Sequence, residues 1–309
     1  MLPLFMRSIK YFIGAGFVGV LLWALAWTLV GLREPTPPSI ETSEFHHHAK
    51  ELKLASDGPF GKFDNAQLQR GFQVYKEVCA SCHGLSYVAF RDLHDLGYEE
   101  PEVKAIADQW ATQVPSIDPK TGEASTRKAL PADKFPSPYP NEVAARAANN
   151  NALPPDLSLI TKARHGGPAY IASLLTGYRD PPANLPKDSR PGTGLYFNPY
   201  FPNLNIAMPP PIASDGQVSY ADGTNPTREQ MATDVSAFLA WAAEPKLENR
   251  KSSGLAVLAF LILATILAYM AYQNIWHGGA SRRVRPTGPL DPENMAKRDE
   301  ASREAGIEG

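Results

Sequence analysis

A short stretch with two cysteines and a histidine carries the residue types and spacing that point most directly to chemistry. It reads Cys79-Ala80-Ser81-Cys82-His83, the C-x-x-C-H pattern of covalent haem c attachment. Two thiols three residues apart can each add to one vinyl group of a haem, while the adjacent imidazole reaches the iron from the same face. The motif therefore predicts one haem c, bound through Cys79 and Cys82, with His83 as an axial ligand.

Two other uses of this cysteine pair are a thioredoxin-like redox site and a simple disulfide. A thioredoxin-like pair is expected to follow a strand and to open a helix. Here the pair closes a predicted amphipathic helix, because Leu68, Phe72, Tyr75 and Cys79 recur at helical spacing. This position favours haem attachment.

The sixth ligand of the iron decides between electron transfer, which a methionine favours, and gas or peroxide chemistry, which an open position favours. The chain has six methionines, of which four lie in or beside the apolar runs near its ends. Met231 lies on the apolar face of the last predicted helix before the second run. Met208 remains as the candidate ligand, followed by Pro209-Pro210-Pro211, which stiffen its loop. His94 and His165 stay open as alternatives.

The elements that must position these groups are predicted to be mainly helical. One helix begins after an N-cap signal at 64–67 and another after the capping box at 227–230. Weaker helical patterns cover 97–110 and 141–150. Proline is abundant, at 29 of 309 residues, and the density of proline and glycine between 177 and 226 indicates long loops. The sequence predicts no strand strong enough to build a sheet.

Two uncharged apolar runs, each reaching the ~20 residues that a membrane-spanning helix needs, divide the chain. The first gives 1–32 as a signal sequence or a membrane anchor, followed by a linker over 33–58. A haem domain is expected over 59–250. The second run predicts a transmembrane helix over 252–276 and leaves a tail over 277–309.

Basic residues flank both runs and predict the orientation of the chain. Arg7 and Lys10 precede the first run, and the cluster Arg282-Arg283-Val284-Arg285 follows the second. By the positive-inside rule both termini are cytoplasmic before any processing. The haem domain is therefore expected on the opposite side of the membrane.

Charge and hydropathy exclude several classes of protein. A mean hydropathy of -0.27 excludes a polytopic membrane protein. The formal net charge is -2, and the stretch 34–250 holds more acidic than basic side chains. This acidic balance argues against nucleic acid as a partner and is compatible with a basic protein partner. The triplet His46-His47-His48 lacks acidic or cysteine companions at ligand spacing and is expected in a solvated segment.

The chain also resembles the cytochrome c1 family, the haem-bearing subunits of the cytochrome bc1 complex. The resemblance extends from Asp57 to the end of the second apolar run and depends on a series of blocks in a fixed order. The blocks are Arg70-Gly71-Phe72-Gln73-Val74-Tyr75 leading into the haem motif, Ala152-Leu153-Pro154-Pro155-Asp156-Leu157-Ser158, Ala163-Arg164-His165-Gly166-Gly167, Ser173-Leu174-Leu175-Thr176-Gly177-Tyr178, Gly194-Leu195-Tyr196-Phe197-Asn198-Pro199-Tyr200-Phe201, Ala207-Met208-Pro209-Pro210-Pro211 and Trp241-Ala242-Ala243-Glu244-Pro245.

This resemblance implies a class I cytochrome c-like haem domain with long proline-rich loops, and His83 and Met208 as axial ligands. It also implies that the carbonyl of Pro155 orients the imidazole. Arg164 and Tyr170 match positions that meet a haem propionate, and Gly71 would let the first and last helices of the domain cross closely.

The implied function is an electron-transfer subunit of the quinol:cytochrome c oxidoreductase complex. The implied partners are cytochrome b, the Rieske iron-sulfur protein as donor, a soluble or membrane-bound cytochrome c as acceptor and the lipid bilayer, in a dimeric complex. The implied location is the bacterial inner membrane, with the haem domain in the periplasm. A stand-alone anchored electron shuttle and a haem enzyme or gas sensor with a labile sixth ligand are the alternatives.

Overall fold

The computed structural model describes residues 2–33, 44–281, 292–304 and 306. The chain divides into two compact units. The first comprises Met1–Lys53 and Asn65–Ala243, and the second comprises Leu54–Asp64 and Glu244–Gly309. The first unit holds every candidate site residue.

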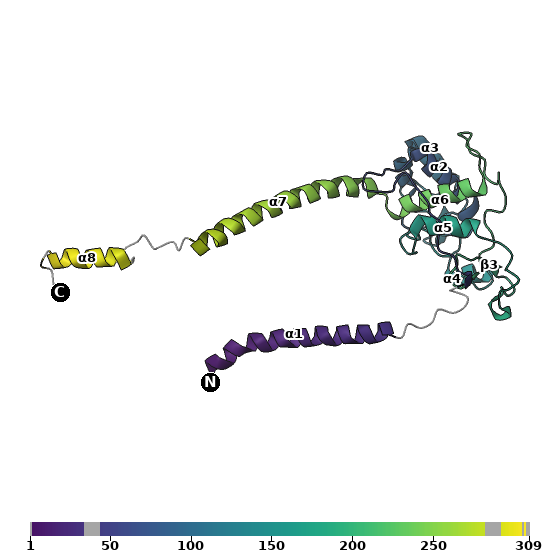
Figure 1. Cartoon of the computed structure of the whole chain (residues 1–309). Coiled ribbons are helices and arrows are strands. Elements are labelled where there is room, and N and C mark those ends of the chain that lie inside the picture. The colour runs from purple at the N-terminus through teal and green to yellow at the C-terminus, as the bar shows by residue number, and fades with distance from the viewer. Residues whose placement is uncertain (1, 34–43, 282–291, 305, 307–309) are drawn as a thin grey trace. The chain divides into compact units, whose positions relative to one another are not determined.

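Three helices form the centre of the first unit, and Figure 1 shows them close together. They are α2 (Asn65–Val74), α5 (Gly167–Thr176) and α6 (Arg228–Ala243), and α6 packs against both of the others. α6 begins where the capping box was predicted, because the hydroxyl of Thr227 accepts a hydrogen bond from the Gln230 N–H at 3.1 Å. The mainly helical prediction is confirmed.

A glycine sets the spacing between α2 and α6. A Cβ added to Gly71 would lie 2.1 Å from the carbonyl oxygen of Asp234 and 2.7 Å from the Cβ of Phe238. Only a residue without a side chain lets the two backbones approach this closely. The close crossing predicted at Gly71 is therefore confirmed.

An aromatic cluster fills the space beside this crossing. Phe72 and Tyr75 come from the first helical segment, and they contact the rings of Trp110, Phe135 and Phe238. Phe72, Tyr75, Phe135 and Phe238 are almost fully buried, so this cluster anchors the helix that leads into the haem motif.

Apart from α1 (Leu2–Arg33), the remaining elements of the unit are short. They are the π-helical turn η2 (Tyr75–Cys79), the 3-10 helices η3 (Phe90–Leu96) and η4 (Lys187–Ser189), the helices α3 (Glu100–Asp108) and α4 (Glu142–Ala148), and the strands β1 (Val114–Ile117), β2 (Ala124–Arg127), β3 (Tyr196–Phe197) and β4 (Asn205–Ile206). The strands form two antiparallel pairs, β1 with β2 and β3 with β4. α3 and α4 confirm the two weaker helix predictions, whereas the small strand pairs differ from the expectation of no strand.

The segment before the haem motif is packed over part of the length that the sequence predicts as a linker. Phe45 is only 8% exposed and lies in an apolar cluster with Leu185, Phe197 and Leu204. The N–H of His47 donates to the carbonyl of Pro199 at 2.7 Å. One buried ring is enough to fix this segment, so residues 45–53 belong with the first unit. The prolines at 35, 37 and 38 lie outside the described residues.

The second unit joins a short strap to the start of a long helix. α7 runs over Leu247–Ser281, so it begins several residues before the predicted span. The strap, residues 54–64, is held to its first turns, because Lys251 Nζ donates to the carbonyl of Ser56 at 2.6 Å and the Phe63 N–H donates to Glu248 at 2.9 Å. Further along the chain lies α8 (Pro292–Glu304), a helix the sequence did not predict.

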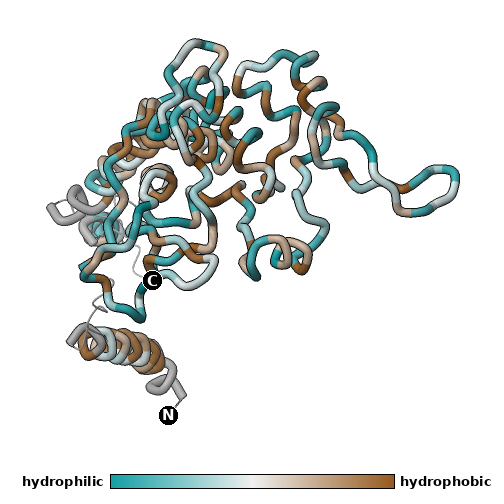
Figure 2. The backbone as a smooth tube through the Cα atoms, turned by 90° about the vertical axis from the view of Figure 1, so that its right-hand side faces the viewer, coloured by the Kyte–Doolittle hydropathy of each residue, from teal (hydrophilic) through white to brown (hydrophobic). Residues whose placement is uncertain are grey.

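Two of the described helices are long and apolar enough to cross a membrane. Their candidate spans are Tyr11–Val30 in α1 (Leu2–Arg33) and Leu247–Ile275 in α7. Figure 2 shows α1 as a largely hydrophobic stretch near the N-terminus. None of the described apolar side chains of the two spans is buried and most are exposed, as expected for lipid-facing helices. The basic cluster at 282–285 lies outside the described residues.

Candidate functional site

The haem motif lies where α2 ends in a π-helical turn. The N–H of Ala80 donates to the carbonyl of Tyr75 at 2.8 Å, and the N–H groups of Cys82 and His83 both donate to the carbonyl of Cys79, at 3.1 and 2.9 Å. Single π-helical turns are rare and concentrate at functional sites. This turn brings two thiols and one imidazole together within one loop.

The two thiols are not joined, and their surroundings do not suit a redox pair. Both cysteines are free and half-buried. Burial raises the pKa of the Cys79 thiol to about 12, with Cys82 adding to the effect. A redox-active pair needs one thiol with a lowered pKa. Because the pair also follows a helix instead of a strand, the thioredoxin-like alternative loses its structural support.

His83 is oriented by its hydrogen bonds. Its Nδ1 lies 2.8 Å from the carbonyl oxygen of Pro155, and the hydroxyl of Tyr75 donates to the His83 carbonyl at 3.2 Å. Burial lowers the pKa of the imidazole, although the Pro155 carbonyl opposes this shift. A neutral ring with Nδ1–H donated to Pro155 presents Nε2 as the nitrogen that can bind iron.

The loop that carries Pro155 is attached to the haem-motif loop by an aspartate that the sequence did not single out. The carboxylate of Asp156 accepts from the N–H of Ser86 at 2.9 Å, from its hydroxyl at 2.6 Å and from the N–H of Ser158 at 2.9 Å. The N–H of Leu157 donates to the carbonyl of Gly84 at 2.9 Å. Three of these hydrogen bonds join the two loops and so fix Pro155 relative to His83, and the fourth, from Ser158, lies within the Pro155 loop.

Met208 follows β4 and is half-buried. Its carbonyl oxygen accepts a hydrogen bond from the hydroxyl of Tyr178 at 3.1 Å. The sequence predicted no role for Tyr178, although the three prolines after Met208 indicated that this loop needs hydrogen-bond donors from other segments. They remove backbone donors from the loop, so donors from elsewhere are needed to hold it. The two alternative ligands are both exposed. His94 lies on η3, where its Nδ1 is within hydrogen-bond distance of the Tyr98 carbonyl oxygen, and His165 lies just before α5.

Arg164 and Tyr170 line a hollow of about 590 Å³, together with the histidine triplet at 46–48. Burial raises the pKa of the Tyr170 hydroxyl, while the charge of Arg164 opposes this shift. Arg164 is exposed, and it donates only to the carbonyl of its neighbour Ala163 among the residues that the structure describes. Its other guanidinium donors can meet an anionic group such as a propionate.

The donor set fits a haem c. Two free thiols, an imidazole with Nδ1 engaged and a half-buried thioether are the groups that covalent attachment and two axial bonds require. Leu153 and Leu159, close in sequence to Pro155, and Leu195, which lines the same hollow as Pro210, are exposed by 37%, 46% and 40%. A haem has the apolar faces that such side chains can cover.

Comparison with known proteins agrees with this geometry. The model of the Cytochrome C1 family matches residues 54–278. A protein of Rhodospirillum rubrum named cytochrome c1 is 47% identical over 231 residues, covering 71% of this chain and 84% of the relative. A protein of Arabidopsis thaliana named cytochrome c1 1, heme protein, mitochondrial, is 43% identical over 272 residues, covering 88% of this chain and 83% of the relative.

The name of a third relative combines cytochrome b with cytochrome c1. The protein of Bradyrhizobium diazoefficiens named cytochrome b/c1 is 46% identical over 245 residues, which cover 72% of this chain and 35% of that relative. The two long matches cover most of the chain, and the family model spans the haem motif, the Pro155 loop and Met208. The chain therefore belongs to the cytochrome c1 family.

Proposed function

We propose that this chain is the haem c subunit that carries single electrons through a cytochrome bc1 complex, from the Rieske iron-sulfur protein to a cytochrome c. The observation that carries the proposal is the hydrogen bond of 2.8 Å between His83 Nδ1 and the Pro155 carbonyl, directly after the two free thiols. When bound, haem supplies a one-electron ferric/ferrous couple. Family membership supports the same assignment.

Each site residue has a defined task in this proposal. Cys79 and Cys82 attach the haem covalently, and His83 stays neutral and oriented toward the iron. Met208 supplies a thioether as the sixth ligand, which raises the reduction potential and closes the iron to gases and peroxide. Pro155 keeps the imidazole in one orientation.

Arg164 and Tyr170 are proposed to hydrogen-bond a haem propionate, because both line the same hollow and carry donors that a carboxylate accepts. The chain itself carries the electron, and quinol oxidation belongs to the complex as a whole. Proton chemistry is accordingly assigned to partner subunits.

The proposed partners and location extend the family assignment. Cytochrome b as a partner is supported by the relative whose name joins b and c1. A dimeric complex with the Rieske protein, in a bacterial inner membrane, follows from the family resemblance. The two apolar helices support membrane attachment. In this proposal the haem domain, over about 59–250, is periplasmic and is preceded by the packed segment 45–53. The C-terminus, beyond the 252–276 span, is cytoplasmic.

Replacing Met208 by leucine tests the ligand assignment. Met208→Leu should remove the methionine-to-iron charge-transfer band of the ferric protein, lower the reduction potential and let the reduced protein bind carbon monoxide. Met231→Leu is the matched control, because Met231 is buried on α6 and should leave all three readouts unchanged. An unaltered band in Met208→Leu would transfer the ligand role to another residue.

Purification in a gentle detergent tests the assignment to a complex. Co-elution of this chain with a b-type cytochrome and a Rieske protein is expected, and elution as a lone subunit would favour the anchored shuttle instead. Labelling of the variants Phe60→Cys and Glu300→Cys with a membrane-impermeant thiol reagent on intact cells tests the orientation, since in the proposal Cys79 and Cys82 are bound to haem and have no free thiol. The first position should react and the second should not.

A further inference from the structure

The three residues that follow Met208 have no backbone donors of their own. Three prolines follow Met208, and a proline has no N–H. A loop of this kind cannot be held by its own N–H groups, so its position depends on donors that reach its carbonyl oxygens. This property makes the residues that supply those donors important for the placement of the thioether.

Two side chains from other segments supply them. The hydroxyl of Tyr178 donates to the Met208 carbonyl at 3.1 Å, and the amide of Gln217 donates to the Pro211 carbonyl at 2.8 Å. The amide oxygen of Gln217 in turn accepts from the N–H of Ala213 at 2.8 Å. The Met208 carbonyl, just before the proline run, is therefore held by Tyr178, and the Pro211 carbonyl, at the end of the run, is held by Gln217.

Tyr178 is itself placed rigidly by the residues around the end of α5. The adjacent Gly177 has no room for a side chain, since an added Cβ would lie 2.5 Å from the ring of Tyr200 and 2.8 Å from the Asn198 amide oxygen. The amide of Asn198, which is fully buried, donates to the carbonyl of Leu174 at 2.8 Å. These contacts fix the backbone from which the Tyr178 ring extends.

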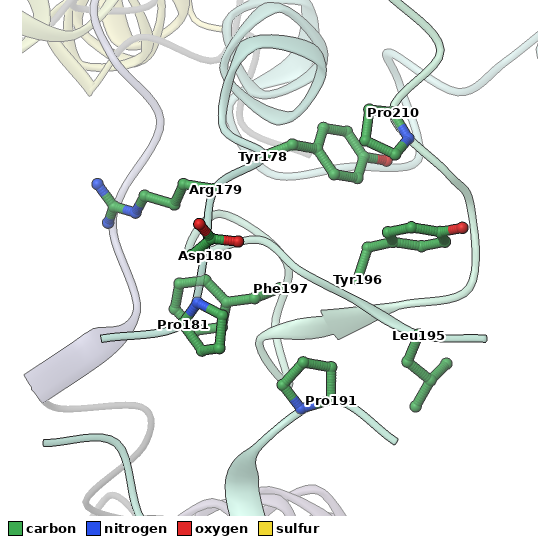
Figure 3. A pocket seen from close by; sticks show the side chains of 9 residues that line it. All are labelled: Tyr178, Arg179, Asp180, Pro181, Pro191, Leu195, Tyr196, Phe197 and Pro210. Atoms are coloured by element: carbon green, nitrogen blue, oxygen red, sulfur yellow. The ribbon is translucent and has the colours of Figure 1, made fainter. Parts of the chain in front are cut away.

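The ring of Tyr178 also forms one wall of a groove of about 400 Å³. Figure 3 shows it beside Pro210, with Tyr196 on the same side of the groove. A tyrosine hydroxyl has an ordinary pKa of about 10, so it carries its proton at neutral pH. A protonated hydroxyl next to the rigid proline run is a permanent donor to the Met208 carbonyl.

We propose that Tyr178 is a positioning residue for the axial methionine: its hydroxyl holds the Met208 main chain so that the sulfur stays on the iron. The proposal rests on the ligand role proposed above for Met208. It predicts that loss of one hydroxyl, 30 residues away in the sequence, weakens the methionine-iron bond without removing the ligand.

Displacement of the methionine by added imidazole measures this effect in the full-length, haem-loaded protein. Imidazole binds the ferric iron only when the thioether has left it, so its apparent affinity reports how often the bond opens. One neutral hydrogen bond changes such an equilibrium by about fivefold. Tyr178→Phe should therefore bind imidazole about fivefold more tightly than the unmodified protein.

Tyr196→Phe is the matched control. Tyr196 lines the same groove and loses the same atom, but no hydrogen bond to Met208 is recorded for it among the described residues. Equal imidazole affinities for Tyr178→Phe and Tyr196→Phe, with the charge-transfer band present in the unmodified protein, would overturn the positioning role alone. An unmodified protein without that band would overturn the ligand role of Met208 as well.

Discussion

The Nδ1 atom of His83 lies 2.8 Å from the carbonyl oxygen of Pro155, which belongs to a loop 72 residues further along the chain. A backbone carbonyl is a firm partner for an imidazole because it moves only with its loop. That loop is held by Asp156 and by the N–H of Leu157 on the Gly84 carbonyl. The orientation of the proximal ligand therefore depends on a short set of hydrogen bonds between two loops.

Replacing Asp156 by alanine should release this loop pair. The change removes three accepted hydrogen bonds, from the Ser86 N–H, the Ser86 hydroxyl and the Ser158 N–H. The two Ser86 donors are exposed and the Ser158 N–H is partly buried, and a hydrogen bond to a charged acceptor contributes about 1.5–3 kcal/mol. We expect the free energy of unfolding to fall by about 2 kcal/mol, measured by urea denaturation of the detergent-solubilised protein with haem absorbance as the readout.

Ser86→Ala is the control for this prediction. It removes only the hydroxyl donor and leaves the two backbone N–H groups on Asp156. Its loss should be about 1 kcal/mol or less. A Ser86→Ala protein as unstable as Asp156→Ala would contradict the role given to the carboxylate.

A buried ion pair beside the α2–α6 crossing makes a second prediction. Arg70 donates to the carboxylate of Asp234 at 2.9 Å, and that carboxylate is fully buried. Arg70→Ala also removes the partner of the more exposed Asp222, and among the described residues it leaves the charge of Asp234 to the amides of Gln67 and Gln230. Removing one partner of a buried pair costs about 3–5 kcal/mol, and the two amides should keep the loss near 3 kcal/mol.

The control for Arg70→Ala is a pair of the same type at the surface. Lys128 and Asp108 lie 2.8 Å apart, with side chains 65% and 54% exposed. Because solvent screens such a pair, Lys128→Ala should change the urea midpoint very little. Equal losses from the two variants would show that Asp234 is more solvated than its position indicates.

The ion pair between Arg127 and Asp133 makes stability depend on pH. The Arg127 guanidinium, donating to the carboxylate at 2.7 Å, lowers the pKa of Asp133, while burial opposes the shift and the Leu130 N–H adds to it. The folded protein thus binds this proton more weakly than the unfolded chain, where the pKa is about 3.9. The stabilisation is complete above that value and is lost as the pH falls through the lower folded pKa.

Arg127→Gln should therefore lower the urea midpoint by a constant amount between pH 7 and about pH 5. Below about pH 4 the difference from the unmodified protein should shrink, because the carboxylate becomes protonated in both proteins. A difference that keeps its full size at the lowest pH would mean that Arg127 stabilises the fold through packing alone.

Local patterns predicted the haem motif and the helices well, because their signals lie within a few adjacent residues. The C-x-x-C-H spacing, the cap at Thr227 and the apolar face of α6 each concern one turn or one helix. The β1–β2 hairpin had no such signal. β1 contains Pro115 and lacks the regular alternation of apolar and polar residues on which strand prediction depends.

Contacts between distant segments could not be predicted from the sequence, for a different reason. Phe45 is one aromatic residue in a polar stretch, and its burial depends on Leu185 and Leu204, far along the chain. Tyr178 donates to a backbone carbonyl, and every residue has such a carbonyl, so the side chain at position 208 carries no trace of this contact. Side-chain-to-backbone contacts between loops leave no periodicity.

The crossing of α2 and α6 at Gly71 makes the final prediction. In Gly71→Ala, the new Cβ would meet the Asp234 carbonyl oxygen at 2.1 Å, and because that atom is backbone, the helices themselves must separate. Overpacking of this kind costs about 1–3 kcal/mol, and it acts on the helix that leads into the haem motif. Gly192→Ala is the control, since nothing lies within 4 Å of its added Cβ. We expect the urea midpoint to fall clearly for Gly71→Ala and to stay unchanged for Gly192→Ala, whereas equal midpoints would mean that the two helices do not need their close approach.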